Sequence, residues 1–226
     1  MRAYTSLVGH ILGSHPEIDG YYEMHRAYML ADDLDRQLGQ YAAHDALKPG
    51  SRLLFDKLLH NDYTLNLALP ELADATLLLA LRPPAATLPS IVALFAQKDR
   101  DDLYATPEGA TAYYVDRLAA LAGFAARHPG RFHYFDADAL LADTPRLFAA
   151  LERWLMLETP LAADYRRFSQ TGVAGAGDAS PALASGRIQR ASSPATFDPV
   201  LLTRADAAYR DCRAQLIAHA AESVLS

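Results

Sequence analysis

Residues near the start of the chain combine the charge and the hydroxyl groups that an anion site needs. Arg2, Thr5 and Ser6 precede the apolar run 7–12, and the pattern predicts a helix over 5–13. Backbone N–H groups at a helix N-terminus attract anions, and an arginine and hydroxyls add direct hydrogen bonds. The segment therefore predicts a phosphate or sulfate site. Ordinary N-capping by Thr5 or Ser6 is the structural alternative.

A second group of residues could move a proton. The turn at His15-Pro16 leads the chain back and delivers Glu23 and His25. Either side chain can act as a general base if it lies within hydrogen-bond reach of a hydroxyl. In an extended segment two such residues point the same way, whereas at a helix start they diverge. Glu23 and His25 are rival candidate bases, and a solvated helix start is the alternative for both.

Lys57 follows the apolar run 52–56 and is one of only three lysines in the chain. A cation beside a buried strand is costly unless it has a partner. We expect Lys57 to stabilise negative charge in the site. An ion pair with Asp56 or Asp62 is the alternative.

Arg82 ends a second apolar run, 76–81, and Ser90 follows eight positions later. Open α/β sheets bind ligands at the carboxyl ends of their strands. The position of Arg82 therefore predicts a ligand contact at this edge of the sheet. The alternatives are a strand-end cap for Arg82 and plain helix surface for Ser90.

Alternation of strands and helices predicts how these residues are positioned. Three short runs are apolar on both faces, as in buried parallel strands, at 52–56, 76–81 and 132–135. Helical patterns are predicted at 5–13, 24–43, 87–97, 107–127, 144–155 and 198–224. We therefore expect a single α/β domain over residues 1–226, with a mostly parallel sheet between layers of helices. The segment 169–194 is rich in Gly, Ala and Ser, and it predicts a mobile loop.

Composition excludes several classes of protein. Of 226 residues, 51% are hydrophobic and 21% are charged, which is typical of a globular domain, and the net charge of −6 speaks against nucleic-acid binding. The longest apolar stretch, 77–81, is too short for a membrane span. A lone cysteine, Cys212, and the absence of a signal segment favour the cytoplasm.

The histidines and glycines do not follow the motifs of other enzyme classes. His10, His60, His128 and His133 lack metal-ligand spacing, so we expect no metal. The Gly-x-Ser-x-Gly and Gly-x-x-x-x-Gly-Lys-Ser/Thr motifs are also missing, which argues against a hydrolase or an ATP-dependent kinase.

Four blocks in this order resemble the sulfotransferases that use 3'-phosphoadenosine 5'-phosphosulfate (PAPS), and in particular the tyrosylprotein and bacterial carbohydrate branch. Arg2–Ser6 stands where this family has its 5'-phosphosulfate loop. His15-Pro16 and Glu23 have the spacing of its His-Pro turn and glutamate base. The block 55–61, with Lys57, is similar to a family strand that ends at the transferred group.

The fourth block carries the most specific likeness. In Leu77–Leu81, Arg82-Pro83-Pro84 and Ser90, the chain resembles the family's Arg–Ser pair that grips the 3'-phosphate. Phe132–Asp136 is similar to a late family strand. The glycine-rich segment after Ser169 is similar to a loop that folds over PAPS, with Arg187 or Arg190 as a 3'-phosphate contact.

The resemblance implies a nucleotide-kinase-like fold, related to that of P-loop NTPases, with PAPS as co-substrate. Glu23 would deprotonate a hydroxyl of a carbohydrate, lipid or secondary metabolite, His25 would orient or contact that acceptor, and Lys57 would stabilise the transferred sulfuryl group. Arg2, Thr5, Ser6, Arg82, Ser90 and Arg187 would hold the nucleotide.

Two departures from the family pattern leave other functions open. Tyr4 stands where the family loop has glycine, and no strand precedes the loop, so we expect the native gene to encode an apolar strand upstream. A non-catalytic relative that binds a nucleotide or a partner is the first alternative. A phosphoryl transferase on a similar fold is the second.

Overall fold

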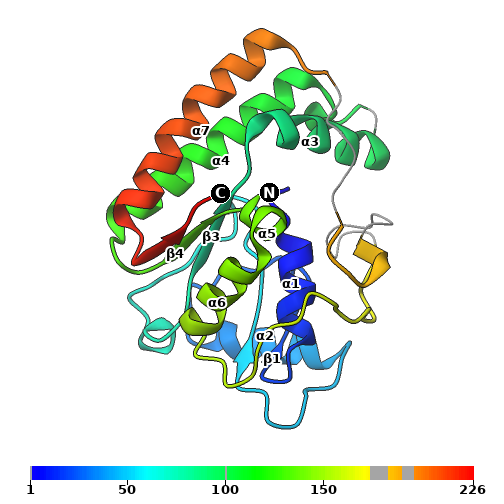
Figure 1. Ribbon diagram of the computed structural model, residues 1–226, viewed down its shortest axis with the longest axis vertical. Helices are drawn as coiled ribbons and strands as arrows, with labels where there is room; N and C mark the ends of the chain where they lie inside the picture. The colour runs from blue at the N-terminus through cyan, green and yellow to red at the C-terminus, as the bar shows by residue number, and fades with distance from the viewer. Residues whose placement is uncertain (1, 100, 174–182, 190–195) are drawn as a thin grey trace. The chain divides into compact units, whose positions relative to one another are not determined.

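A computed structural model describes residues 2–99, 101–173, 183–189 and 196–226 of the chain (Figure 1). The chain divides into two units. Unit 1 consists of Met1–Ala3, Thr76–Asp143 and Ala191–Ser226, and unit 2 consists of Tyr4–Ala75 and Thr144–Arg190. Each unit holds helices and parallel strands, so the protein is a mixed α/β protein, as the sequence predicts.

Unit 1 is built on a three-stranded sheet in the order β3-β4-β5. Its strands are β3 (Leu78–Leu81), β4 (His133–Asp136) and β5 (Glu222–Val224), and both pairs are parallel. The helices of this unit are α3 (Pro84–Lys98), α4 (Pro107–Arg127), α5 (Ala139–Ala142) and α7 (Pro199–His219), with a 3-10 turn at Leu103–Ala105. Helices α4 and α7 run along one another (Figure 1).

Local sequence explains the long helices of unit 1. Thr106 caps α4, because its hydroxyl accepts the N–H of Gly109 at 3.1 Å, and Pro107 occupies the first helical position. Asp198 caps α7 in the same way, through the N–H groups of Val200 and Leu201. The apolar faces of both helices then pack into one buried cluster that includes residues of α3, β3 and β4.

Unit 2 contains a two-stranded parallel sheet, β1 (Ile18–Asp19) and β2 (Leu53–Leu54). Its helices are α1 (Thr5–Ser14), α2 (Asp32–Ala42) and α6 (Thr144–Trp154), with 3-10 turns at Pro70–Leu72 and Leu183–Ser185. Isolated bridges join Tyr28 to Leu65 and Asp164 to Arg187. Much of this unit is therefore irregular backbone held by individual contacts.

The helix predicted over 24–43 is wrong in its first third, because α2 begins only at Asp32. The Asp33 carboxylate accepts the N–H groups of Met29 and Leu30, each at 2.9 Å. The backbone N–H of Met24 donates to the Asp56 carboxylate at 2.9 Å. These side chains satisfy backbone groups that a helix would otherwise have to pair, so the segment stays outside the helix.

Several other element boundaries differ from the prediction. Helix α3 starts at Pro84 rather than 87, since Pro84 fits the first helical position. The final helix ends at His219, and residues 222–224 instead form β5 beside β4. Strand β2 covers only Leu53–Leu54 of the predicted run, and β1, whose pairing needs a partner far along the chain, was not predicted.

The predicted mobile loop 169–194 falls only partly within the described residues. Thr171 accepts the N–H of Phe168 at 2.8 Å, and Leu183 is buried. Residues 174–182 and 190–194, with Arg190, lie outside the described residues, so the mobility stays a prediction. None of the helices in the described part of the chain combines the length and apolar content that crossing a bilayer requires.

Candidate active site

The parallel pairing of β1 and β2 positions two of the predicted catalytic residues in unit 2. Glu23 follows β1 and Lys57 follows β2, so both come after the carboxyl ends of neighbouring strands. Gly20 makes this close pairing feasible: its φ is +83°, and a Cβ atom there would lie 2.1 Å from the Phe55 carbonyl oxygen. No other residue type fits that position without moving β2.

Asp56 anchors the segment that carries Glu23 and His25. Its carboxylate accepts the Tyr28 hydroxyl at 2.6 Å and the backbone N–H groups of Met24 and Lys57 at 2.9 and 2.6 Å. Burial raises the pKa of Asp56 above its ordinary value, against the lowering effect of these hydrogen bonds and of the Lys57 charge. Glu23 therefore sits on a fixed backbone rather than on a fraying helix end.

Glu23 is a buried carboxylate between two imidazoles. Its Oε1 lies 3.7 Å from Nδ1 of His25 and 3.7 Å from Nε2 of His60. Only 6% of the residue is exposed, and within the described part of the chain Oε1 accepts no hydrogen bond. Burial raises the pKa of Glu23, although the charges of His25 and Lys57 oppose the shift and that of Asp56 adds to it. A carboxylate with a raised pKa and an available oxygen is suited to accept a proton.

His25 lies beside Glu23 in a strained backbone conformation. Its φ is +53°, in the left-handed region that side-chain-bearing residues seldom adopt. The Tyr63 hydroxyl lies 3.2 Å from Nδ1 of His25, and the Tyr63 ring packs edge-on against both His25 and His60. The backbone at His25 is therefore neither extended nor helical, and the distance of 3.7 Å between Oε1 of Glu23 and Nδ1 of His25 brings the two side chains together.

Lys57 and Ser6 meet at the start of α1. Lys57 is 4% exposed, and its ammonium donates to the Ser6 hydroxyl at 3.2 Å. The N-cap of α1 is Tyr4, so the alternative of N-capping by Thr5 or Ser6 is wrong: both are helical residues of the first turn. Tyr4 has φ +55°, the left-handed region that favours glycine. The structure thus brings Ser6 and Lys57 together beside the N–H groups of the first turn.

Unit 1 brings together three residues predicted to bind the nucleotide. The Nε of Arg2 donates to the Ser90 hydroxyl at 2.8 Å, joining residues 88 positions apart. Arg82 donates through Nη1 to the carbonyl oxygen of Arg2 at 3.4 Å. Two guanidinium groups and a hydroxyl therefore form a local basic cluster in a chain of net charge −6. Planar guanidinium groups are well suited to phosphate oxygens.

Backbone contacts fix Arg82 at the end of β3. Its carbonyl oxygen accepts the hydroxyl groups of Tyr114 and Thr87, at 2.7 and 3.2 Å. The side chain is mostly buried, and its Nε lies 3.9 Å from a carboxylate oxygen of Asp138. Arg187 lies in unit 2, where it is exposed and its backbone pairs with Asp164. Among the described residues, no side-chain contact of Arg187 indicates a nucleotide role.

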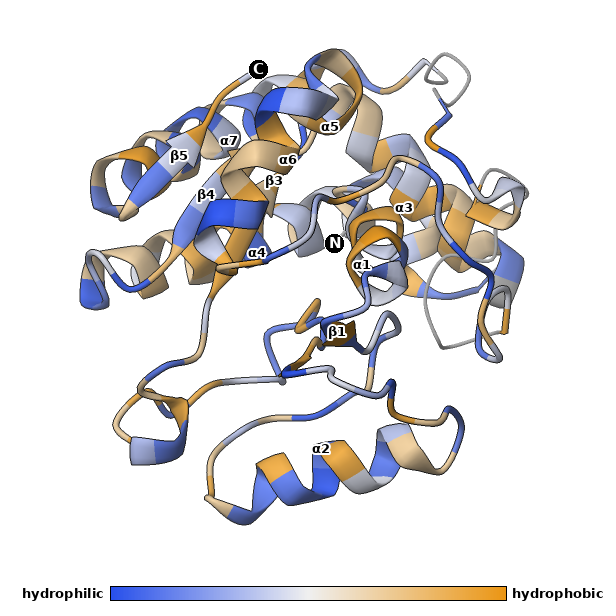
Figure 2. Cartoon of the chain, turned by 60° about the horizontal axis from the view of Figure 1, so that its bottom comes forward, coloured by the Kyte–Doolittle hydropathy of each residue, from blue (hydrophilic) through white to orange (hydrophobic). Residues whose placement is uncertain are grey.

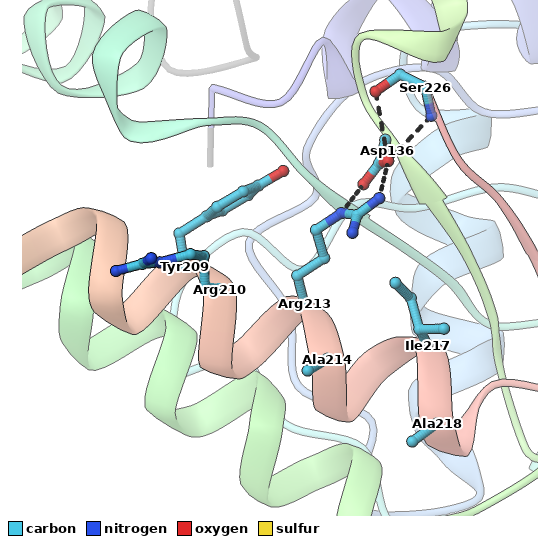
Figure 3. A pocket seen from close by; sticks show the side chains of 8 residues that line it. All are labelled: Asp136, Tyr209, Arg210, Arg213, Ala214, Ile217, Ala218 and Ser226. Atoms are coloured by element: carbon cyan, nitrogen blue, oxygen red, sulfur yellow. Dashed lines mark hydrogen bonds and ion pairs between the residues drawn. The ribbon is translucent and has the colours of Figure 1, made fainter.

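A hollow of about 700 Å³ elsewhere in unit 1 was not predicted from the sequence (Figure 3). It lies between the end of β4 and α7, with Asp136, Tyr209 and Arg213 in its lining. Arg213 donates from Nε and Nη2 to the two Asp136 oxygens at 2.8 and 2.7 Å. This forked ion pair joins α7 to β4, so its role is structural.

His60 and Tyr63 are the members of the Glu23 cluster that sequence reasoning missed as site residues. His60 was considered only as a metal ligand, and among the described residues no group of three or more His, Cys, Asp and Glu side chains is arranged to hold a metal. The sequence did contain a signal for these two site residues. His60 lies three residues after Lys57 in the block 55–61, and Tyr63 follows two residues after the end of that block.

Comparison with known proteins gives no match: no family model matches the chain, and neither a curated protein nor a solved structure is significantly similar to it. The interpretation of the site therefore depends on its chemistry.

Proposed function

We propose that this protein is a sulfotransferase that moves a sulfuryl group from PAPS to a hydroxyl acceptor. The acceptor class is a carbohydrate, a lipid or a secondary metabolite. We also infer a three-layer, nucleotide-kinase-like fold, which the parallel pairing of every strand pair described supports.

The contact between Arg2 and Ser90 carries the proposal. It connects the block that resembles the phosphosulfate loop with the block that resembles the 3'-phosphate site. Arg82 contacts the backbone of the same residue, Arg2. In an acidic protein a built cluster of this kind favours a ligand with phosphate groups.

Glu23, His25 and Lys57 of unit 2 are the residues that carry out the chemical step in this proposal. Sulfuryl transfer resembles phosphoryl transfer, so the protein must orient the acceptor, remove its proton and stabilise negative charge. Glu23 takes the proton of the acceptor hydroxyl on Oε1 as the oxygen bonds to sulfur and the S–O bond to the nucleotide breaks. Lys57 and the first-turn N–H groups of α1 stabilise the charge of the transferred group. His25 contacts the acceptor, since Tyr63 already engages its Nδ1.

Thermal unfolding with nucleotides tests the binding part of the proposal. Adenosine 3',5'-bisphosphate should raise the melting temperature, and ATP should not. Arg82→Ala should weaken bisphosphate binding by about 10- to 100-fold, the effect of one charge-assisted hydrogen bond, and leave binding of adenosine 5'-phosphate nearly unchanged. Arg204→Ala, which removes an exposed arginine of α7, is the matched control and should change neither.

Three results would contradict the proposal in different ways. Equal losses for both nucleotides in Arg82→Ala would remove the 3'-phosphate assignment. Stabilisation by ATP instead would favour a phosphoryl transferase. Tight bisphosphate binding with no transfer from labelled PAPS to phenol, glucose or 1-dodecanol would favour the non-catalytic relative.

A further inference from the structure

The hollow of unit 1 is placed where open parallel sheets bind ligands (Figure 3). Asp136 is the last residue of β4 and Ser226 follows β5, so the lining includes the carboxyl ends of two neighbouring strands. Its volume of about 700 Å³ is within the range of small-molecule sites. The described lining residues include none of the proposed transfer site, so this hollow needs an explanation of its own.

Six of the lining residues form a stripe along α7. They come from three successive turns, namely Tyr209 and Arg210, Arg213 and Ala214, and Ile217 and Ala218. Residues four positions apart share a helix face, and eight positions span about 12 Å. Tyr209 and Arg210 lie at one end of the stripe and the aliphatic Ile217 and Ala218 at the other (Figure 3). The lining is therefore cationic at one end and apolar at the other.

The negative charge of Asp136 is already compensated. Its carboxylate accepts two nitrogens of Arg213, the Tyr134 hydroxyl and the backbone N–H of Ser226. Arg213 is thereby held in place, with 30% of its side chain exposed. Arg210 is exposed, and within the described part of the chain its side chain donates only to the carbonyl oxygen of Asp206, at 3.4 Å. Arg210 is thus available to an anion.

Tyr209 adds a hydroxyl group at the cationic end. Burial raises the pKa of Tyr209 to about 12, so at neutral pH the hydroxyl keeps its proton and can donate it to an anion. The charge of Asp138 also acts on Tyr209, but Nε of Arg82 lies 3.9 Å from an Asp138 oxygen and offsets it. At the other end, Ile217 and Ala218 present only hydrocarbon to a ligand.

We propose that this hollow binds an amphiphilic carboxylate, with its head group beside Arg210 and Arg213 and its hydrocarbon chain along Ile217 and Ala218. Guanidinium groups pair well with carboxylates, and burial of methylene groups on the apolar end favours a chain of medium length. A small anion would use only the cationic end, and a neutral alcohol only the apolar end. The inference does not depend on the proposed transfer reaction.

Isothermal titration calorimetry of the whole protein with three probes tests the ligand class. Octanoate should bind with one-to-one stoichiometry. Acetate lacks the chain and 1-octanol lacks the charge, so each should bind at least about 10-fold more weakly. Acetate binding as tightly as octanoate would reduce the hollow to an anion site, and 1-octanol binding as tightly would reduce it to an apolar patch. Either result, or no octanoate binding, overturns this proposal and leaves the proposed transfer function untouched.

Substitutions on α7 test where octanoate binds. Ala214→Glu adds a carboxylate to the lining and should weaken octanoate binding by about 10-fold or more, because like charges repel. Ala207→Glu, at an exposed position of α7 outside the hollow, is its matched control. Arg210→Gln should also weaken binding by about 10-fold, with the exposed Arg204→Gln as control. Arg213 is left intact because it holds Asp136.

Two results of these titrations would contradict the proposed site. Equal octanoate affinity in Ala214→Glu and Ala207→Glu would show that octanoate binds elsewhere. Displacement of octanoate by adenosine 3',5'-bisphosphate would show that the hollow is part of a nucleotide site, which would overturn a separate carboxylate site. Independent binding of the two ligands, with the losses confined to the lining variants, is the expected outcome.

Discussion

The two units differ in the polar side chains that they bury. Unit 1 packs a large apolar cluster from α3, α4, α7 and its sheet. Unit 2 also buries apolar side chains, including Leu12, Ile18 and Leu151 and a cluster rich in tyrosine. Most buried polar side chains of the described residues lie in unit 2, namely Ser6, His10, His15, Glu17, Asp19, Glu23, Asp33, Gln37 and Lys57. The reacting groups of the proposed mechanism belong to the unit with the polar interior.

Colouring by hydropathy shows the same difference within unit 2 (Figure 2). Helix α1 is mainly hydrophobic, and its glycines lie close to the backbone that follows β1. Helix α2 is mainly hydrophilic, and its buried residues are Asp33, Gln37 and Tyr41. A polar interior must satisfy every donor and acceptor, and it costs stability wherever a charge is left without full compensation. We therefore expect the reacting groups of the proposed mechanism and the stability of the fold to depend on separate residues.

Asp136 gives the largest expected effect, because its buried carboxylate pairs with Arg213 in unit 1. Burial raises its pKa, but Arg213, Tyr134 and the Ser226 N–H outweigh burial, so the pKa of Asp136 lies below its ordinary value. Asp136→Asn should lower the free energy of unfolding at pH 7 by about 3 kcal/mol, near the lower end for breaking a buried pair. Urea denaturation measures it. The difference from the unmodified protein should shrink as the pH falls below about 4, where the carboxyl group protonates.

Replacing Glu23 should change the free energy of unfolding in the opposite direction to replacing Asp136. Its pKa is raised by burial, so its ionised form destabilises the fold at neutral pH. Glu23→Gln should therefore raise the free energy of unfolding at pH 7, and this gain should disappear as the pH falls through the raised pKa, where the native carboxyl group is also neutral. A loss of stability in Glu23→Gln at pH 7 would show that Glu23 holds the fold, contrary to the separation of catalysis and stability.

Close packing of α1 gives the next effect. A Cβ atom on Gly9 would lie 2.5 Å from the Tyr21 carbonyl oxygen, which is backbone and cannot turn away. Gly9→Ala should lower the free energy of unfolding by about 1–3 kcal/mol, as overpacking does. Gly39 in α2 is the matched control, because a Cβ atom there meets nothing within 4 Å. Gly39→Ala should stabilise by about 0.5–1 kcal/mol through helix propensity. Equal effects at both positions would remove the contrast between the two helices.

The same contrast explains how far the sequence predicts the fold. In unit 1 the helix predicted over 107–127 has the observed bounds of α4, because Thr106, Pro107 and an apolar face are local signals. In unit 2 the segment 24–31 has a helical pattern but is kept out of a helix by Asp33 and by Asp56, whose partner Met24 is 32 residues away. Hydrophobic periodicity carries no information about such side-chain to backbone bonds.

Local signals also explain which residues of the candidate site could be predicted. Glu23 and Lys57 were predicted as site residues because each follows a recognisable turn or strand. His60 and Tyr63 were not, because their approach to Glu23 requires the chain after Lys57 to fold back onto it. Residue type and spacing along the chain do not encode that return. Arg2 and Ser90 were both predicted as nucleotide-binding residues, and their side chains are in contact.

Backbone strain in unit 2 gives the smallest expected effect. Tyr4 has φ +55°, a conformation that disfavours any residue with a Cβ atom by about 1–2 kcal/mol relative to glycine. Replacing Tyr4 removes its side-chain packing in both Tyr4→Gly and Tyr4→Ala, so a comparison of these two variants isolates the backbone. Glycine loses ~0.5–1 kcal/mol through its more flexible unfolded chain, which offsets part of the relief. Tyr4→Gly should therefore be the more stable of the pair by up to about 1 kcal/mol in urea denaturation. Alanine being the more stable would show that position 4 does not hold the left-handed conformation in solution.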